Sequence, residues 1–501
     1  MDSGALLIAA ILFPVAGAIG LAAWPGLDRR GATWGGAGVS LVELVLVGIL
    51  AVGYKPHGPV YQDTSRHALA SSFGLTWNVG VDGIALLLIV LTAIIVPIAI
   101  IGAPLAHRTS AAVAWLLVLE AATIGSFASI DVLLFFLFFE LTLVPAYFLI
   151  AQWGDRARGP AAAMKFFVYT LVGSAFLFVG ILAIGFLHRS QFGGPLTFSL
   201  PALSQTHLSG TTGVLLVLAF TAAFAVKSPL FPFHTWSPDA YAEAPVAGSV
   251  VLAALLAKLG TYGILRFDIT LFPDALRTVG PWLFALAIVG ILYGAVVACG
   301  SSELKRLLAY SSLAQVGFIV LGTVSLNSTG VSGAVLLMFN HGIITAALFL
   351  LVGFLSSRRG TSEVAGLRGL QGPAPVFAAL FTVAMLASIG LPGLNGFVSE
   401  FLVLLGFFGA QGWWAVIPTL GVIVAAMYLL WAYQQVFQGR AEGDNATMSD
   451  LTWTERGVLA PLVAIMVILG VYPKIVLDRI LPSVLHLLAH AHVATTAVTG
   501  R

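Results

Sequence analysis

The 501-residue sequence is a succession of apolar runs, each about 20 residues long, separated by short polar segments. A helix of about 20 residues crosses the roughly 30 Å hydrocarbon core of a bilayer. Hydrophobic residues make up 59% of the chain and charged residues only 9%, whereas soluble proteins carry about 25% charge. The sequence therefore predicts an all-α polytopic membrane protein with about 14 transmembrane helices.

Two of the predicted spans are irregular. The seventh, over 212–235, carries prolines beside Lys227, and the twelfth, over 374–406, is interrupted by LPGLNG at 391–396. These spans are five helices apart, and a repeat of an odd number of helices has inverted topology. Inverted repeats that each contain a discontinuous helix are a recurring transporter plan, with the ion path where the repeats meet.

This arithmetic predicts a division of the chain into four parts. They are an N-terminal three-helix segment (1–109), a first five-helix bundle of helices 4–8 (110–268), a second, inverted bundle of helices 9–13 (279–437), and the last helix with a C-terminal tail (456–501). Arginine and lysine are more frequent in loops after odd-numbered spans, which predicts that both termini lie on the outer side. This bias suits a bacterial inner membrane. We expect the tail from Lys474 to lie at the interface, with Pro482 breaking any helix.

Several function classes are excluded by missing motifs. The single cysteine, Cys299, allows neither an intrachain disulfide nor a cysteine-ligated iron–sulfur cluster within this chain. The sequence has no phosphate-binding loop and no dinucleotide fingerprint. A net charge of +2 gives no reason to expect a nucleic-acid partner. We therefore expect no cofactor and no metal in this chain, and any redox chemistry would take place on partner chains.

Two lysines lie within apolar runs. A lysine at the centre of a membrane helix costs about 2.5 to 3.5 kcal/mol on insertion scales, so such residues are usually functional. Lys227 stands beside the helix-breaking Pro229, and Lys258 follows a long run of apolar or small residues. Burial favours the neutral amine, which would let these lysines exchange protons. The alternative is a lysine that extends to the membrane surface, for which Lys258 lies too deep.

Two mid-span acids complement the lysines. Glu140, in FFELTLVPAYFLI, could pair with Lys227 as a switchable couple or remain a neutral, hydrogen-bonded carboxyl group. Glu400 follows the break in the twelfth span and mirrors Lys227. It could be the terminal proton site on the outer side, or it could complement the positive end of a half-helix. Glu43 and Glu120 are also near mid-span and could face a neighbouring subunit, but their role stays open.

Four further basic residues are candidates for proton transfer. His341 lies mid-span, and we expect it between Lys258 and Glu400 along the proton path. It could act as a proton relay or be a hydrogen-bonded packing residue. His234 is seven residues beyond Lys227, two helical turns if the helix continued. Lys165 could lie near Lys227 or extend to the surface. Lys305 starts the tenth span and could feed protons inward or anchor the helix at the interface.

Three segments carry a family resemblance. They are KSPLFPFHTWSPDAYAEAPVAGSVVLAALLAKLGTYGILRF at 227–267, ELKRLLAYSSLAQVGFI at 303–319 and GLPGLNGFVSEF at 390–401. Together they resemble the antiporter-like membrane subunits of respiratory complex I over most of the chain. The acid at Glu400 favours the paralogue that carries an acid there over its lysine-bearing relatives. One departure is Tyr241, where the family commonly has histidine, which puts a relay role for that position in doubt.

The resemblance implies a fold and a function. It implies 14 helices in two inverted five-helix bundles around a polar axis. That axis would hold the Glu140–Lys227 pair, Lys258, His341 as relay and Glu400 as terminal acid. The chain would be a non-redox, proton-translocating subunit of a NADH–quinone oxidoreductase, beside the antiporter-like L and N subunits, with FMN, iron–sulfur clusters and quinone on partner subunits. The alternative is a subunit of an Mrp-type Na⁺/H⁺ antiporter, which shares the fold and the charged residues.

Overall fold

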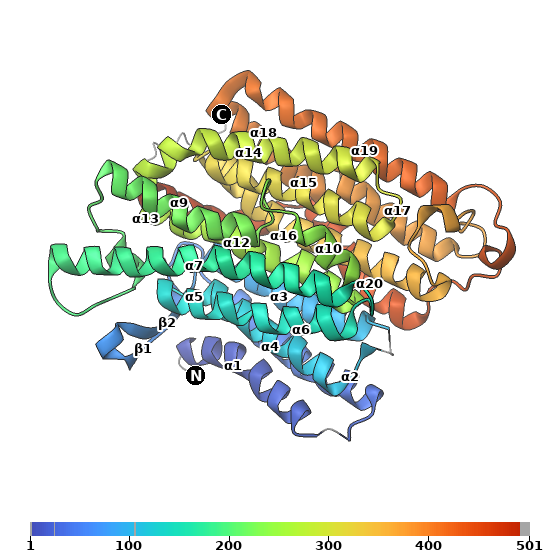
Figure 1. Ribbon diagram of the computed structural model, residues 1–501, viewed down its shortest axis with the longest axis horizontal. Coiled ribbons are helices and arrows are strands. Elements are labelled where there is room, and N and C mark those ends of the chain that lie inside the picture. The colour runs from blue at the N-terminus through green and yellow to red at the C-terminus, as the bar shows by residue number, and fades with distance from the viewer. Residues whose placement is uncertain (1–2, 25, 105–106, 491–501) are drawn as a thin grey trace.

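Long apolar helices make up nearly all of the architecture (Figure 1). The computed structural model describes residues 3–24, 26–104 and 107–490. Its first half contains α1 (Ser3–Ala22), α2 (Arg29–Gly53), β1 (Gln62–Ala70), β2 (Leu75–Val81), α3 (Gly83–Gly102), α4 (Ser110–Ala128), α5 (Val132–Leu141), α6 (Leu143–Trp153), α7 (Gly159–Phe192), α8 (Leu200–Leu203), α9 (Gly210–Lys227), α10 (Trp236–Glu243), α11 (Val246–Val251), η3 (Leu252–Leu256), α12 (Ala257–Gly263), η4 (Ile264–Asp268) and α13 (Ile269–Leu271). The second half contains α14 (Pro273–Cys299), α15 (Leu304–Val324), α16 (Ser328–Arg359), α17 (Pro375–Ile389), α18 (Asn395–Gln411), α19 (Val416–Phe437), α20 (Trp453–Val471) and α21 (Lys474–His490), besides short 3₁₀ turns.

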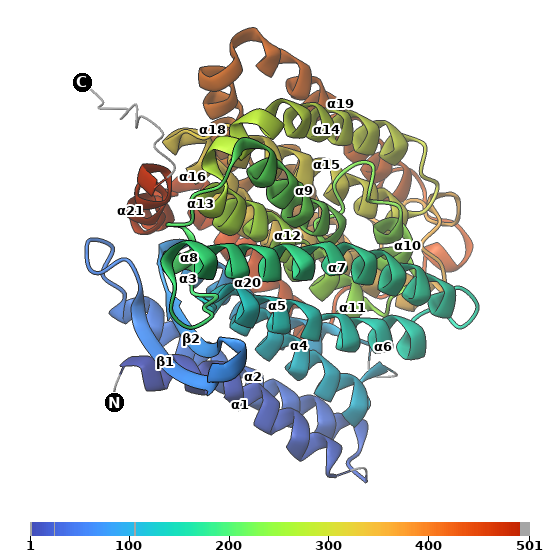
Figure 2. The ribbon, with the colours of Figure 1, turned by 60° about the vertical axis from the view of Figure 1, so that its left-hand side comes forward.

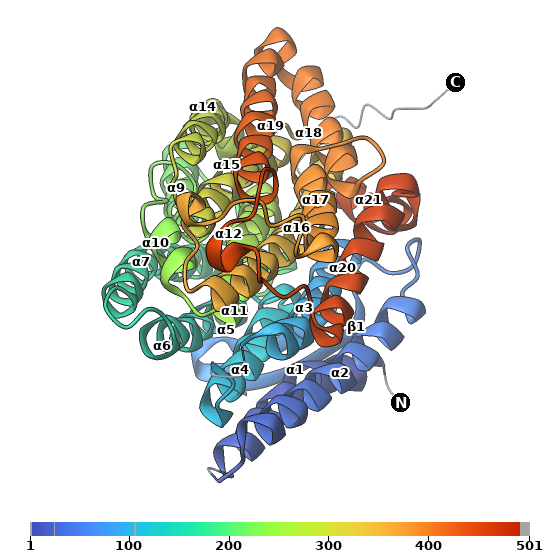
Figure 3. The same cartoon turned by 90° about the vertical axis from the view of Figure 1, so that its right-hand side faces the viewer.

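The number of crossings agrees with the sequence prediction. The described residues contain 13 stretches long and apolar enough to cross a membrane, one of which is the 43-residue stretch Asn395–Phe437. The chain reverses in this stretch at Gly412, whose φ of +60° suits glycine, so that α18 and α19 are separate crossings (Figure 3). Counting them separately gives 14 crossings, and the all-α membrane class is confirmed.

Both irregular spans are interrupted where the sequence predicts. The first break follows α9 at Lys227, and the chain turns through Pro229 and Pro232 before α10 begins. Proline removes the backbone donor that a continuous helix needs. The second break follows α17 at Gly390, whose φ is +82°, and α18 resumes at Asn395. Because lipid cannot satisfy a free backbone group, such breaks must face protein or water.

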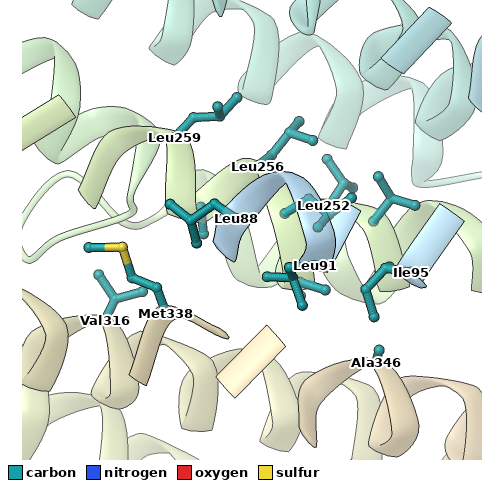
Figure 4. Close-up of a cluster of buried hydrophobic side chains, with 14 of the residues drawn as sticks. Leu88, Leu91, Ile95, Leu252, Leu256, Leu259, Val316, Met338 and Ala346 are labelled. Atoms are coloured by element: carbon teal, nitrogen blue, oxygen red, sulfur yellow. The ribbon is translucent and has the colours of Figure 1, made fainter. Parts of the chain in front are cut away.

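The centre of the molecule is formed by helices that do not reach lipid. The most apolar windows of α16 and of the segment Val246–Leu271 are completely buried within the chain. These helices pack against α3 and α15 through an apolar cluster (Figure 4), which includes Leu88, Leu91, Leu256, Leu259 and Met338. Such close packing leaves a buried lysine or histidine in this region without access to the surrounding bilayer.

Two features differ from the sequence-based expectation. Residues 62–81 form an antiparallel hairpin, β1–β2, which packs beside α1 (Figure 2). Its polar residues lie outside the apolar runs, so hydropathy gave no signal for it. The expectation that Pro482 breaks any helix in the tail is wrong, because α21 runs continuously from Lys474 to His490. A proline can stay inside a helix where neighbouring groups compensate for the lost hydrogen bond.

Candidate functional site

The deepest basic group is Lys258, at the start of α12. The preceding turn, η3, is π-helical, a departure from regular geometry that is frequent at functional sites. The Lys258 side chain is 1% exposed, and its Nζ atom donates a hydrogen bond of 2.6 Å to the carbonyl oxygen of Ala253 within η3. The same Nζ atom lies 2.8 Å from Nδ1 of His341 on α16. The structure thus brings the predicted central lysine and the predicted relay histidine into direct contact.

The second buried lysine ends the first half of the broken seventh span. Lys227 is 1% exposed, and its Nζ atom donates to Oγ1 of Thr142 at 2.9 Å and approaches the carbonyl oxygen of Phe139 at 3.4 Å. It also lies 4.5 Å from the centroid of the Phe139 ring, a cation–π contact. Thr142 sits at the junction of α5 and α6, where Pro145 has no N–H to offer the helix. Because the helix is irregular at this junction, the carbonyl oxygen of Phe139 and the hydroxyl of Thr142 can accept hydrogen bonds from Lys227.

Glu140 is a near neighbour of Lys227 rather than its hydrogen-bond acceptor. The carboxylate of Glu140 is half-buried and interacts electrostatically with Lys227. The ammonium group, however, uses the hydroxyl of Thr142 and the carbonyl of Phe139. Lys227 therefore contacts the junction of α5 and α6 that follows Glu140, and not the Glu140 carboxylate itself. A movement of Glu140 would not break a buried ion pair.

The second predicted acid lies beside the other helix break. Glu400 is 5% exposed on α18, and its Oε1 atom accepts a hydrogen bond of 2.7 Å from Nε2 of Gln315 on α15. Its Oε2 atom faces Gly390, where an added Cβ would come within 2.7 Å of it. Glu400 therefore occupies a fitted polar position between α15 and the end of α17.

Buried polar side chains join α16 to the start of α18. Asn340, next to His341, donates from Nδ2 to the carbonyl oxygen of Asn395 at 2.8 Å and lies 3.3 Å from Oγ of Ser399. Asn395 is fully buried, and neither of its side-chain polar atoms has a hydrogen-bond partner among the described residues. Such atoms are usually satisfied by water. The candidates predicted from the sequence did not include Asn340, Asn395, Gln315 or Thr142, although each is a polar residue inside an apolar run.

Lys165 and Lys305 lie away from Lys227, at one end of the bundle. Lys165 forms an ion pair of 2.7 Å with Asp239 rather than approaching Lys227. Lys305 donates to the carbonyl oxygen of Ala242 at 3.1 Å. Lys305 also lines a polar cavity of about 450 Å³, together with His107, Arg158 and Glu243. Burial lowers the pKa of His107 and raises the pKa of Glu243, opposed in the latter by the nearby arginines.

His234 and Tyr241 are separate from the lysines. His234 lies in the turn between α9 and α10, where its ring stacks on Phe231 and meets Tyr293 edge-on. Its Nδ1 atom has no hydrogen-bond partner among the described residues. The hydroxyl of Tyr241 is likewise buried and unpartnered in the described part of the chain. Because α9 ends at Lys227, the two-turn helical spacing between Lys227 and His234 does not apply.

Glu43 and Glu120 form a buried acid pair inside this chain. Both are 0% exposed, on α2 and α4, and they interact with each other. Oγ of Ser40 donates to Oε1 of Glu120 at 2.6 Å. The notion that these acids face a neighbouring subunit is therefore wrong. Both carboxylate oxygens of Glu43 and Oε2 of Glu120 have no hydrogen-bond partner among the described residues.

Comparisons with known proteins agree with this architecture. The family described as "NADH:quinone oxidoreductase/Mrp antiporter, TM" matches residues 129–427, more than half of the chain. NADH-quinone oxidoreductase subunit M of Rhodobacter capsulatus is 41% identical over 477 residues, covering 93% of this chain and 92% of the relative. NADH-ubiquinone oxidoreductase chain 4 of Arabidopsis thaliana is 37% identical, covering 96% of each chain.

Solved structures extend the comparison to three dimensions. A chain of respiratory complex I from Thermus thermophilus superimposes with a TM-score of 0.87 at 33% identity, covering 97% of this chain and 99% of that one. A chain of the Mrp complex from Dietzia shares the fold with a TM-score of 0.83, but at 19% identity. The relatives that share substantial sequence are complex I subunits, so the likeness to the Mrp complex concerns the fold alone. The chain is an integral membrane protein and belongs to the family of antiporter-like complex I subunits represented by subunit M and chain 4.

Proposed function

We propose that this chain is a proton-translocating subunit of the membrane arm of a NADH–quinone oxidoreductase. The observation that supports this most directly is the contact between Lys258 and His341, 2.8 Å apart and sealed from lipid. An amine and an imidazole in contact can pass a proton between them. Burying both has a high free-energy cost, which a purely structural helix bundle would have no reason to bear.

The proposed path runs along the polar centre of the molecule. Protons enter from the inner side through the polar cavity beside Lys305, pass Lys227, Lys258 and His341, and leave outward at Glu400. The helices that carry Lys227 and Lys258 are in direct contact, because Gly260 on α12 packs against the backbone of Ser228. The buried amides Asn340 and Asn395 lead from His341 toward Glu400. Lys165 and His234 would adjust the electrostatic potential near the helix break that follows Lys227, and would not carry the proton.

Energy would arrive as a change in charge rather than as electrons. A change of environment around Glu140 would alter the field at Lys227 and drive the lysine to take up or release its proton. The chain would itself be non-redox, with FMN, iron–sulfur clusters and quinone on partner subunits and the antiporter-like L and N subunits beside it. We place it in a bacterial inner membrane with both termini outside.

The alternative is a subunit of an Mrp-type Na⁺/H⁺ antiporter. The same fold and the same buried lysines would serve either assembly, so the site alone does not separate them. The sequence relatives named as subunit M and chain 4 favour the complex I assignment.

Co-purification followed by a pumping assay tests the proposal. Tagged chain is extracted in mild detergent, and its partners are identified by mass spectrometry. NADH-driven proton uptake is then measured in reconstituted vesicles for the native chain, Lys258→Met and the exposed-loop control Lys55→Met. We expect flavin and iron–sulfur subunits to co-purify and only Lys258→Met to lose pumping. Small hydrophobic partners with Na⁺-dependent collapse of the pH gradient would instead establish the antiporter.

A further inference from the structure

An apolar slot of about 260 Å³ lies between α2, α3, α16, α20 and α21. Its walls include Leu87, Val90, Ile94, Ile468 and Val476. At one end it is bounded by Tyr54, Gly83 and Arg479. None of the groups assigned to proton transfer lines it. We call it the α3–α21 slot.

The length of the slot matches half a membrane. It extends along α3 from Gly83, the first residue of the helix, to Ile94. Eleven residues of helix rise about 16 Å, close to half of the roughly 30 Å hydrocarbon core. The slot therefore reaches from one interface to about the bilayer centre, the depth occupied by the acyl chains of one leaflet.

The interfacial end of the slot is polar and carries Arg479, which forms no ion pair among the described residues. The Tyr54 hydroxyl lies 3.3 Å from Oγ of Ser483, which accepts a hydrogen bond from the backbone N–H of Gly83. The side chain of Arg479 is exposed and donates from Nη1 to the carbonyl oxygen of Ile475. Lys474 is held differently, by an ion pair of 2.6 Å to Asp478. The remaining guanidinium donors of Arg479 are thus available at the mouth of an apolar slot.

We propose that the α3–α21 slot binds one acyl chain of an anionic phospholipid, whose phosphate is held by Arg479. The walls are apolar, so water gains little by filling them, whereas a hydrocarbon chain gains contact area. An arginine guanidinium matches the geometry of a phosphate and can bind it with two hydrogen bonds. In the orientation proposed above, the lipid belongs to the outer leaflet. It ties α21 to α2 and α3, which are far from α21 in the sequence.

Native mass spectrometry of the full-length chain tests this proposal. The chain, purified in detergent, is titrated with phosphatidylglycerol or with the zwitterionic phosphatidylcholine of the same acyl composition. We expect one bound phosphatidylglycerol per chain, preferred over phosphatidylcholine by about tenfold, because the choline ammonium of phosphatidylcholine repels the Arg479 guanidinium and partly neutralises the phosphate. Arg479→Gln should abolish this preference, and Val90→Trp, which fills the slot, should abolish the bound lipid.

Two matched variants serve as controls. Lys474→Gln removes a neighbouring cation that is already paired with Asp478. Val45→Trp adds an indole on α2 outside the slot, at a position where the native valine is 60% exposed. Both should bind phosphatidylglycerol as the native chain does. Equal binding of the two lipids to the native chain would overturn the proposal, as would a bound lipid retained in Val90→Trp or a quinone recovered in place of phospholipid. Arg479→Gln changes only an exposed side chain, so its result does not depend on repacking the helices.

Discussion

The Nζ atom of Lys258 and the Nδ1 atom of His341 lie 2.8 Å apart, on two helices that neighbouring helices enclose on all sides. An ammonium group has three donors and no acceptor, so Nδ1 of His341 must accept when Lys258 is charged. His341 then carries its proton on Nε2, on the opposite side of the ring. Transfer from Lys258 to Nδ1 would leave a proton on each ring nitrogen and allow release from Nε2. The geometry of the contact thus favours proton transfer from Lys258 to Nδ1 of His341 and release from Nε2.

Replacing Lys258 by methionine removes the first half of this relay while keeping the length of the side chain. We expect NADH-driven proton uptake to fall by at least about tenfold, the effect of removing a single positioned proton donor or acceptor. His341→Gln should lower uptake in the same way, because an amide does not titrate. Proton uptake per NADH oxidised in reconstituted vesicles is the measurement, and normal uptake in either variant would refute the relay.

Thr142 is predicted to matter through Lys227. Thr142→Val keeps the shape of the side chain but removes the hydroxyl that accepts from the ammonium. A hydrogen bond to a charged group contributes about 1.5 to 3 kcal/mol, so we expect the rate of proton uptake to change by about tenfold or more. Thr142→Ser restores the hydroxyl and should pump normally. Two variants with equal rates would show that the hydroxyl does not position Lys227.

Gln315 provides a comparable test at the other end of the path. Gln315→Leu removes the amide donor to Oε1 of Glu400, which disfavours the charged carboxylate. We expect slower release of protons to the outer side and a shift of the pH–rate profile to higher pH. Gln315→Asn, whose amide is one methylene shorter, tests the distance and should shift the profile in the same direction by a smaller amount. An unchanged profile in Gln315→Leu would argue against Glu400 as the terminal site.

The packing of Gly260 predicts a structural effect on the path. A Cβ at this position would lie 2.4 Å from the carbonyl oxygen of Phe224 and 2.6 Å from the backbone nitrogen of Ser228. Overpacking of this kind typically destabilises by about 1 to 3 kcal/mol, so Gly260→Ala should lower the melting temperature and impair pumping. Gly48→Ala on α2 meets no atom within 4 Å. It should leave the melting temperature unchanged or raise it slightly.

Asp239 predicts a pH dependence of stability. Burial opposes its ionisation, but hydrogen bonds from Lys165 and Arg306 outweigh burial and lower its pKa. A carboxyl whose pKa is lowered on folding stabilises the protein above its unfolded pKa of about 3.9. This contribution is lost as the pH falls through the folded pKa. The pair is partly exposed, so the effect is at most about 1 kcal/mol.

Thermal unfolding of the purified chain checks the sign of this effect. Asp239→Asn should melt below the native protein at about pH 6, and the difference should vanish at about pH 2. Asp444→Asn, at an 89% exposed position, is the control and should melt like the native protein at both values. A difference that grows as the pH falls would contradict the proposed role of Asp239.

The features that follow from hydropathy could be predicted from the sequence. The crossings and both helix breaks were foreseen, because apolar runs and proline or glycine interruptions are local signals. The direct contact of Lys258 with His341 joins residues 83 positions apart, and only their expected order along the path could be inferred. The polar hairpin over 62–81 gives no hydropathy signal. The continuous helix α21 depends on tertiary packing around Pro482, which a local rule for proline does not contain.

Side-chain pairing was the least predictable level. The sequence allows Lys165 to lie near Lys227, but Lys165 pairs with Asp239. Lys227 in turn is held by Thr142 rather than directly by Glu140. Which partner a charged group selects depends on the rotation of neighbouring helices about their axes. Rotation by one residue moves a side chain by about 100° around the helix, a detail that hydropathy does not record.

The complete burial of the central part of α16 limits how this protein can move. A rigid-body rotation of α16 would disrupt close-packed contacts on every face of the helix at once. A rotation of the His341 ring would break one hydrogen bond and leave the backbone in place. The less costly step is therefore local, and access to either side of the membrane would be switched by side chains and water inside a stationary frame.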